Sequence, residues 1–78
     1  MMASKEDILW LKDNWKQFGK HGTQIAAEIG IKQQTWSAFV TDSIDVDKIN
    51  FMTAIKLSNY SIKQQNLLNE HKEEKHVK

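Results

Sequence analysis

The sequence predicts an all-α protein: a compact five-helix domain that contains a helix-turn-helix. The chain of 78 residues has no proline, its three glycines fall within residues 19–30, and apolar residues recur at three- and four-residue steps outside that segment. A chain of this length makes one domain, which we place at residues 1–68. Residues 69–78 are polar apart from Val77, and we expect them to form a frayed C-terminal tail.

The first predicted helix begins after Ser4 and runs to about Phe18. Ser4 and Asp7 have the spacing of a capping box, in which a serine side chain accepts a hydrogen bond from the N–H three residues on. The apolar stripe of this helix consists of Ile8, Leu11, Trp15 and Phe18. Trp10 points to the opposite side, so it is either an exposed tryptophan of a small protein or a contact between subunits.

The next two predicted helices are short and are separated by a sharp turn. The second runs from about Thr23 to Ile29, and the third from Lys32 or Gln33 to Val40. A helix-turn-helix needs a small residue where its helices approach, a glycine in the turn, and apolar anchors that fix the second helix. The residues that meet these requirements are Ala26, Gly30, Trp36 and Phe39. The alternative is a plain helical hairpin inside a small bundle.

The fourth predicted helix, about residues 46–58, has apolar residues on nearly all of its sides. Such a helix is either central to the core or packs a second surface against a partner. Asn59 and Tyr60 predict a break, after which Ser61 and Gln64 have capping-box spacing for a fifth helix.

Composition and charge limit the functions that are open to the chain. The eleven basic residues are all lysine, and with ten acidic residues the net charge is +1, so any basic surface for nucleic acid must be local. No apolar run reaches the roughly 20 residues of a membrane helix and no signal peptide is visible, so we expect a soluble cytoplasmic protein.

Residues that would carry catalysis are not visible either. The sequence shows no nucleophile–base set, no glycine-rich phosphate loop and no buried carboxylate pair, so we expect no enzyme, no cofactor and no small-molecule ligand. His71, Glu74 and His76 lie in a tail without a core to fix the geometry of metal ligands, so we expect no metal site.

One segment of the chain resembles a known family. Residues 22–39, GTQIAAEIGIKQQTWSAF, look like the helix-turn-helix of the phage Cro and repressor group, also called the XRE type. Residues 30–35 are similar to the Gly-Val-Lys-Gln-Gln-Ser opening of a recognition helix in that group, and the resemblance extends to about Leu57. It implies a lambda-repressor-like fold and a homodimer that binds double-stranded DNA specifically, as a small transcriptional repressor of a phage or mobile element. This chain has Trp36 where the family usually has valine or isoleucine.

The resemblance also implies how DNA would be read, with a recognition helix of about residues 32–40 in the major groove. Gln33 and Gln34 would contact base edges, and a glutamine amide can pair with adenine. The alternative for both is a solvated helix start. The complete base-reading set is Gln33, Gln34, Thr35, Ser37 and Ala38. Because arginine is absent, we expect a preference for A·T-containing sites.

Two further sets of residues complete the predicted site. The residues expected near DNA phosphates are Lys16, Lys20, Thr23, Gln24, Lys32 and Lys48. The residues expected at a homodimer interface are Trp10, Phe51 and Leu67.

A second class of function stays open: a protein-interaction module on the same scaffold, such as an antirepressor, an antitoxin or an inhibitor of a host enzyme. The low net charge and the outward-facing Trp10 favour it. The loop after the third predicted helix also favours it, since this loop carries Asp42, Asp45 and Asp47, whose charges repel phosphates.

Overall fold

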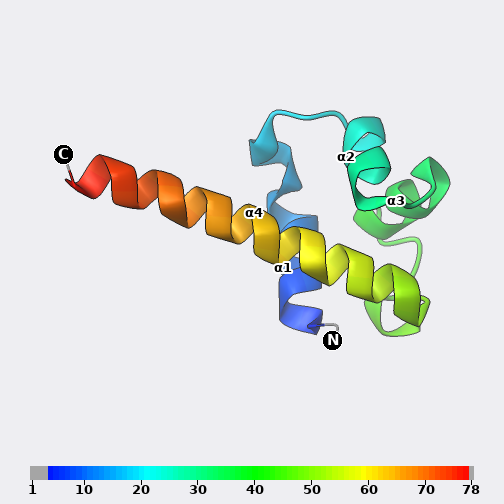
Figure 1. Cartoon of the computed structure of the whole chain (residues 1–78). Coiled ribbons are helices and arrows are strands. Elements are labelled where there is room, and N and C mark those ends of the chain that lie inside the picture. The colour runs from blue at the N-terminus through cyan, green and yellow to red at the C-terminus, as the bar shows by residue number, and fades with distance from the viewer. Residues whose placement is uncertain (1–3, 78) are drawn as a thin grey trace.

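The computed structural model describes residues 4–77, and side chains within residues 4–69. All regular structure in this part of the chain is helical (Figure 1). In chain order the elements are α1 (Lys5–Asn14), the 3₁₀ helix η1 (Trp15–Phe18), α2 (Gly22–Ile29), α3 (Gln33–Val40), the 3₁₀ helix η2 (Val46–Lys48) and α4 (Phe51–Val77).

Helix α4 is the element against which the others are arranged. Its 27 residues span about 40 Å, close to the longest dimension of the molecule, 43 Å. Helices α1 and α2 pack against the first half of α4, and α3 packs against α2. The second half of α4 extends beyond the other elements (Figure 1). The buried apolar residues between the helices are Ile8, Leu11, Ile25, Ala26, Ile29, Trp36, Phe39, Leu57 and Tyr60.

The helix ends follow from local signals. Ser4 Oγ accepts a hydrogen bond from the N–H of Asp7 at 3.3 Å, which confirms Ser4 as the N-cap, whereas the Asp7 side chain accepts from Gln65 instead of completing the capping box. The N–H of Ser4 donates to Ser58 Oγ at 3.1 Å, which ties the start of α1 to α4. Gly19 and Gly30 end η1 and α2 with φ angles of 70° and 89°, in the left-handed region that favours glycine.

The first helix is shorter than predicted. Helix α1 ends at Asn14, and residues 15–18 form the tighter η1. The Nδ2 of Asn14 donates to the carbonyl of Trp10 at 2.8 Å. Asparagine competes in this way with regular helix hydrogen bonding, which accounts for the change of helix type at this residue.

The prediction of five helices is wrong: the described residues form four α-helices. The segment 46–50 contains only η2, capped by Asp45, and one continuous helix runs through the predicted break at Asn59 and Tyr60. Tyr60 and Ser61 are 8% and 0% exposed, so both face the core. Their burial favours continuation of the helix, and tertiary packing outweighs the weak helix propensity of these residues. Ser61 is therefore an interior residue of α4 and caps no fifth helix.

The predicted tail overlaps the end of this long helix. Helix α4 continues across the boundary placed at residue 68 and ends at Val77, while side chains from residue 70 onward lie outside the described ones. None of the described helices combines the length and the apolar character that a membrane span requires.

Candidate nucleic-acid interface

The turn between α2 and α3 is held by three hydrogen bonds. The N–H groups of Gly30 and Ile31 both donate to the carbonyl of Ala26, at 2.9 and 3.0 Å. The ammonium of Lys56, on α4, donates to the carbonyl of Gly30 at 3.2 Å. The contact of Lys56 could not be predicted from the sequence, because it depends on α4 passing close to the turn.

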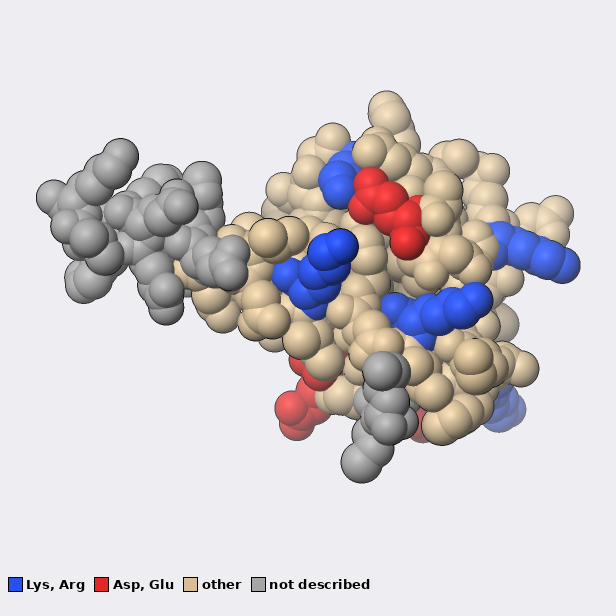
Figure 2. Space-filling view, viewed as in Figure 1, with Lys and Arg blue, Asp and Glu red and all other residues tan. Residues whose placement is uncertain are grey.

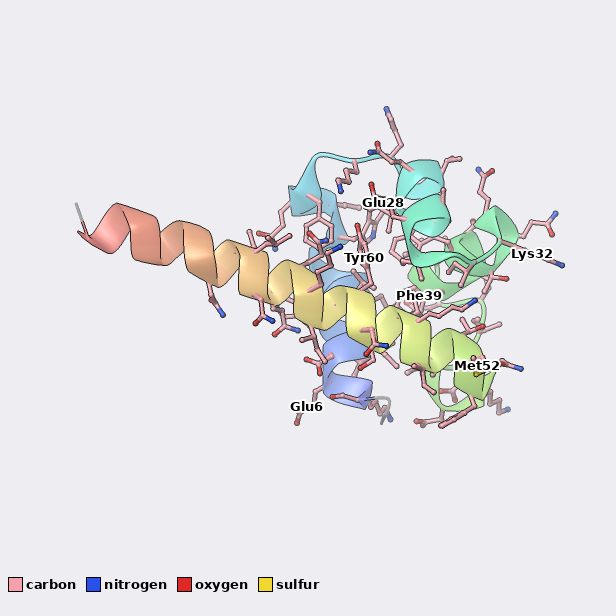
Figure 3. All side chains as sticks on the ribbon, viewed as in Figure 1. Glu6, Glu28, Lys32, Phe39, Met52 and Tyr60 are labelled. Carbon is pink, nitrogen blue, oxygen red and sulfur yellow. The ribbon has the colours of Figure 1, made fainter. Side chains whose placement is uncertain are left out.

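Helix α3 is anchored by two aromatic side chains. Trp36 and Phe39 are 2% and 1% exposed, and their ring centroids lie 5.5 Å apart. Trp15 packs edge-on against Trp36, with centroids 5.6 Å apart. Phe39 lies between α3 and α4, whereas Lys32, at the start of α3, points away from the body (Figure 3). The predicted anchors are confirmed as buried, and they leave the opposite face of α3 in solvent.

The predicted base-reading residues divide into two groups. Gln33, Gln34 and Ser37 are exposed on the outer face of α3, whereas Thr35 and Ala38 are half-buried at its flanks. Thr41 is exposed and lies one turn beyond Ser37, to whose carbonyl its hydroxyl donates at 2.7 Å. Its four-residue spacing from Ser37 is the signal that could have found it. The outer polar surface of α3 is therefore formed by Gln33, Gln34, Ser37 and Thr41.

The predicted phosphate-contacting residues also fall into two groups. Lys16, Lys32, Lys48 and Thr23 are exposed, and among the described side chains none of the three lysines pairs with an acid. These three lysines lie on η1, at the start of α3 and on η2. An external phosphate could meet each of them without displacing a partner of the same chain.

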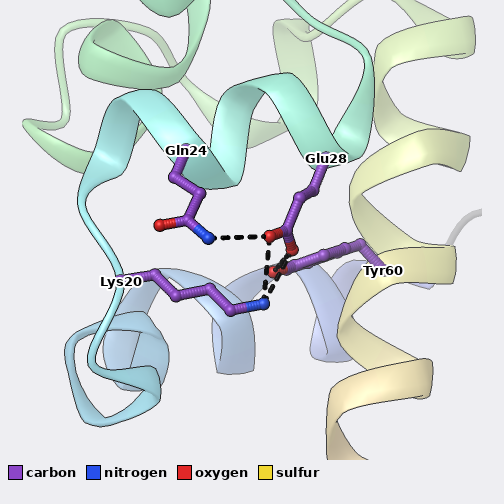
Figure 4. Close-up of polar contacts among 4 residues, drawn as sticks. All are labelled: Lys20, Gln24, Glu28 and Tyr60. Atoms are coloured by element: carbon purple, nitrogen blue, oxygen red, sulfur yellow. Dashed lines mark hydrogen bonds and ion pairs between the residues drawn. The ribbon is translucent and has the colours of Figure 1, made fainter.

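Lys20 and Gln24 instead belong to a polar cluster around Glu28 (Figure 4). Lys20 Nζ donates to the two carboxylate oxygens of Glu28 at 2.9 and 3.1 Å, and Gln24 Nε2 donates to the same group at 3.3 Å. The hydroxyl of Tyr60, on α4, donates to Glu28 Oε1 at 2.9 Å. The cluster joins α2, the segment before it and α4. A phosphate would have to compete with Glu28 for Lys20.

The two ionisable groups at the centre of this cluster have shifted pKa values. The hydrogen bond from Lys20, followed by that from Tyr60, holds the pKa of the Glu28 carboxyl below its usual 4.5. Burial, followed by the hydrogen bond to the Glu28 carboxylate, raises the pKa of Tyr60 above its usual 10.0. The sequence predicts neither residue as part of a site, because their contact joins positions that are 32 residues apart.

The acidic loop after α3 is partly neutralised within the chain. Asp42 pairs with Lys12, and Asp47 pairs with Lys5 at 3.0 Å. On the face that Figure 2 shows, blue side chains project singly and are separated by tan surface, with one red group among them and more red atoms at the lower edge of the view. The lysines on that face therefore do not merge into one basic patch.

A cleft of about 320 Å³ opens where the start of α2 meets α3. Its walls include Trp15, Gly22, Thr23, Gln33 and Trp36, and no carboxylate lines it. The cleft thus connects a predicted phosphate-contacting residue, Thr23, with a predicted base-reading residue, Gln33.

The three residues predicted for a dimer interface do not lie on one surface. Trp10 is half-buried and packs against Phe18, with ring centroids 6.1 Å apart. Phe51 and Leu67 are 67% and 49% exposed. Helix geometry places these two about 24 Å apart along α4 and on nearly opposite sides of it.

The comparisons with known proteins found nothing similar to this chain. No protein-family model, no curated protein and no solved structure matches it. Among the described side chains, no group of three or more His, Cys, Asp or Glu residues could hold a metal ion, and the tail residues His71, Glu74 and His76 lie outside that set.

Proposed function

We propose that this chain binds double-stranded DNA in a sequence-specific manner, with α2 and α3 acting as a helix-turn-helix and α3 entering the major groove. One observation carries the proposal. Gln33, Gln34 and Ser37 form an exposed polar face on a helix whose opposite face is fixed in the core by Trp36 and Phe39. A major groove admits one α-helix, and amide side chains at the start of such a helix can pair with base edges.

The surroundings of α3 are compatible with a duplex. Thr23, at the start of α2, and Lys32, at the start of α3, are both exposed, and we expect them to contact phosphates. Arginine is absent from the whole chain, which removes the commonest reader of guanine. We therefore propose A·T-containing target sites. As the biological role, we propose repression of transcription for a phage or mobile element.

The proposed binding unit is a homodimer, because a single short recognition helix contacts too few base pairs for useful selectivity. The second half of α4, which extends beyond the other helices, carries Leu67 and Leu68 at 49% and 37% exposure. Burial of these leucines against a second copy would remove apolar surface from water. Sedimentation of the protein with and without a duplex tests this step, and a one-to-one complex on a selected site contradicts it.

The test of DNA binding is selection of sites from random duplexes, followed by titration of the selected site with Gln33→Ala/Gln34→Ala. Loss of a bidentate base contact costs about 1–3 kcal/mol, so the double variant should bind at least tenfold more weakly while its helical spectrum is unchanged. Asn66→Ala removes an exposed amide from α4 and is the matched control. Equal affinities for all three proteins would contradict the proposal.

A second candidate, a protein-interaction module, is favoured by a different observation. Phe51 and Met52 are adjacent at the start of α4 and are 67% and 60% exposed. Large apolar side chains exposed side by side are typical of protein-binding surfaces. A salt titration distinguishes the two functions, because affinity for DNA falls steeply with salt. Absence of binding to pooled random duplexes at low salt would favour the protein partner.

A further inference from the structure

The indole N–H of Trp36 is a buried donor without an acceptor. Trp36 is 2% exposed, and its Nε1 is closed to solvent. Among the described side chains it has no hydrogen-bond partner. Buried polar groups are almost always paired, so an unpaired one calls for an explanation.

The residue next to this donor is Gly22, the first residue of α2. A Cβ at this position would lie 2.8 Å from Trp36 Nε1 and 3.1 Å from Cδ1, which is too close for any side chain. Glycine therefore leaves the indole N–H facing the backbone at the start of α2. Gly22 also has the conformational freedom to shift when a ligand approaches.

The start of α2 also carries backbone N–H groups that have no acceptor within the helix. The side chain of the N-cap residue, His21, makes no capping hydrogen bond. The N–H groups of Gly22, Thr23 and Gln24 precede the first intrahelical bond, which runs from Ile25 to the carbonyl of His21. These N–H groups point out of the helix at the positive end of its dipole, where anions bind favourably.

The cleft between α2 and α3 is bordered by Trp36 and by the first residues of α2, and its lining contains no carboxylate. We propose that this cleft is a seat for a phosphate oxygen of the DNA backbone, and that the indole N–H of Trp36 donates to it together with the first N–H groups of α2. The oxygen reaches the indole as Gly22 shifts. The inference rests on the proposed DNA binding and adds a residue, Trp36, that acts both as core anchor and as phosphate contact.

The seat can be tested on the unmodified protein by NMR. Each of the three tryptophans gives one indole N–H resonance, and that of Trp10, which lies outside the cleft, serves as the internal control. The protein is titrated with a random-sequence duplex and, separately, with inorganic phosphate at constant ionic strength. We expect the duplex to shift the Trp36 indole resonance and the Gly22 amide, and free phosphate to shift them weakly in the same direction.

The outcomes separate this inference from the proposed function. If the duplex shifts the amides of α3 but leaves Trp36 and Gly22 unmoved, DNA binding stands and the phosphate seat is overturned. If free phosphate shifts Trp36 but no duplex binds, the anion seat is supported and its source is a free phosphate. If neither ligand shifts any resonance, both proposals fail.

A pair of variants gives a second, independent test. Trp36→Phe removes the donor and should weaken binding about tenfold for every duplex sequence, the effect of losing a hydrogen bond to a charged group. The slope of log K against log salt should stay unchanged, since a neutral donor releases no counterions. Trp10→Phe removes an indole that packs on Phe18 outside the cleft and is the control. Equal binding by Trp36→Phe and the unmodified protein overturns the seat.

Discussion

Substitution of Gly22 by alanine tests how tightly α2 packs on α3. In an ordinary helix this change stabilises by up to about 1 kcal/mol, because alanine has the higher helix propensity. Here the new Cβ would lie 2.8 Å from Trp36 Nε1. The indole cannot move aside freely, since it is 2% exposed and contacts both Trp15 and Phe39. Overpacking of this kind costs about 1–3 kcal/mol, so we expect a net loss of about 1 kcal/mol.

The measurement is a double-mutant cycle with Trp36→Phe, followed by urea unfolding and circular dichroism. A phenylalanine ring lacks the Nε1 atom that the new methyl group meets, so Gly22→Ala should cost less in that background. We expect a coupling energy of about 1 kcal/mol. Gly19→Ala is the matched control: no atom lies within 4 Å of its Cβ position, and its cost comes from a φ of 70° alone.

Two results would refute this reasoning. The first is a Gly22→Ala protein that is more stable than the unmodified chain, because helix propensity would then outweigh the contact. The second is additivity of Gly22→Ala and Trp36→Phe to within about 0.3 kcal/mol, since independent sites behave in that way.

Three further predictions concern the Glu28 cluster and the turn. Tyr60 is the single tyrosine of the chain, so its ultraviolet titration is unambiguous: because its pKa is raised above 10.0, it should ionise at higher pH in the folded protein than in urea. The associated stability is present below pH 10 and falls as pH rises above it, and this fall should be absent in Tyr60→Phe. The lowered pKa of Glu28 contributes stability that is present above pH 4.5 and is lost as pH falls below it; acid unfolding of Glu28→Gln should lack this part of the pH dependence. Gly30→Ala should lose about 1–2 kcal/mol in urea unfolding because its φ is 89°, whereas equal stability would contradict the left-handed turn.

The segment from Gly22 to Val40 was accessible to sequence reasoning because its signals are local. Gly30 stops one helix at the position where a left-handed residue is needed, and the three-residue spacing of Trp36 and Phe39 identifies the buried side of the next. Helix α4 was not accessible in the same way. Asn59 and Tyr60 are poor helix formers, but the burial of Tyr60 against other helices keeps the helix continuous.

The residues of the candidate site divide in the same way, into those that local sequence predicts and those that only the fold brings together. The exposure of Gln33, Gln34 and Ser37 follows from the periodicity of α3, so the sequence predicts their exposure correctly. The polar cluster around Glu28 could not be predicted, since Tyr60 joins it from 32 residues away. Neighbours along the chain determine the first group, and only the folded arrangement of α2 on α4 determines the second.

The ion pair of Lys20 with Glu28 affects the salt dependence that we expect for the proposed DNA binding. The predicted phosphate contacts include four lysines, but Lys20 already bonds both oxygens of Glu28, at 2.9 and 3.1 Å. If only Lys16, Lys32 and Lys48 neutralise phosphates, log K should fall with log salt with a slope of about −2.7 per protomer. Lys32→Gln should reduce the magnitude of this slope by about 0.9, whereas Lys20→Gln should leave it unchanged. Equal slope changes in the two variants would show that Lys20 leaves Glu28 for a phosphate of the duplex. The Glu28 cluster would then rearrange when DNA binds, instead of linking α2 to α4 rigidly.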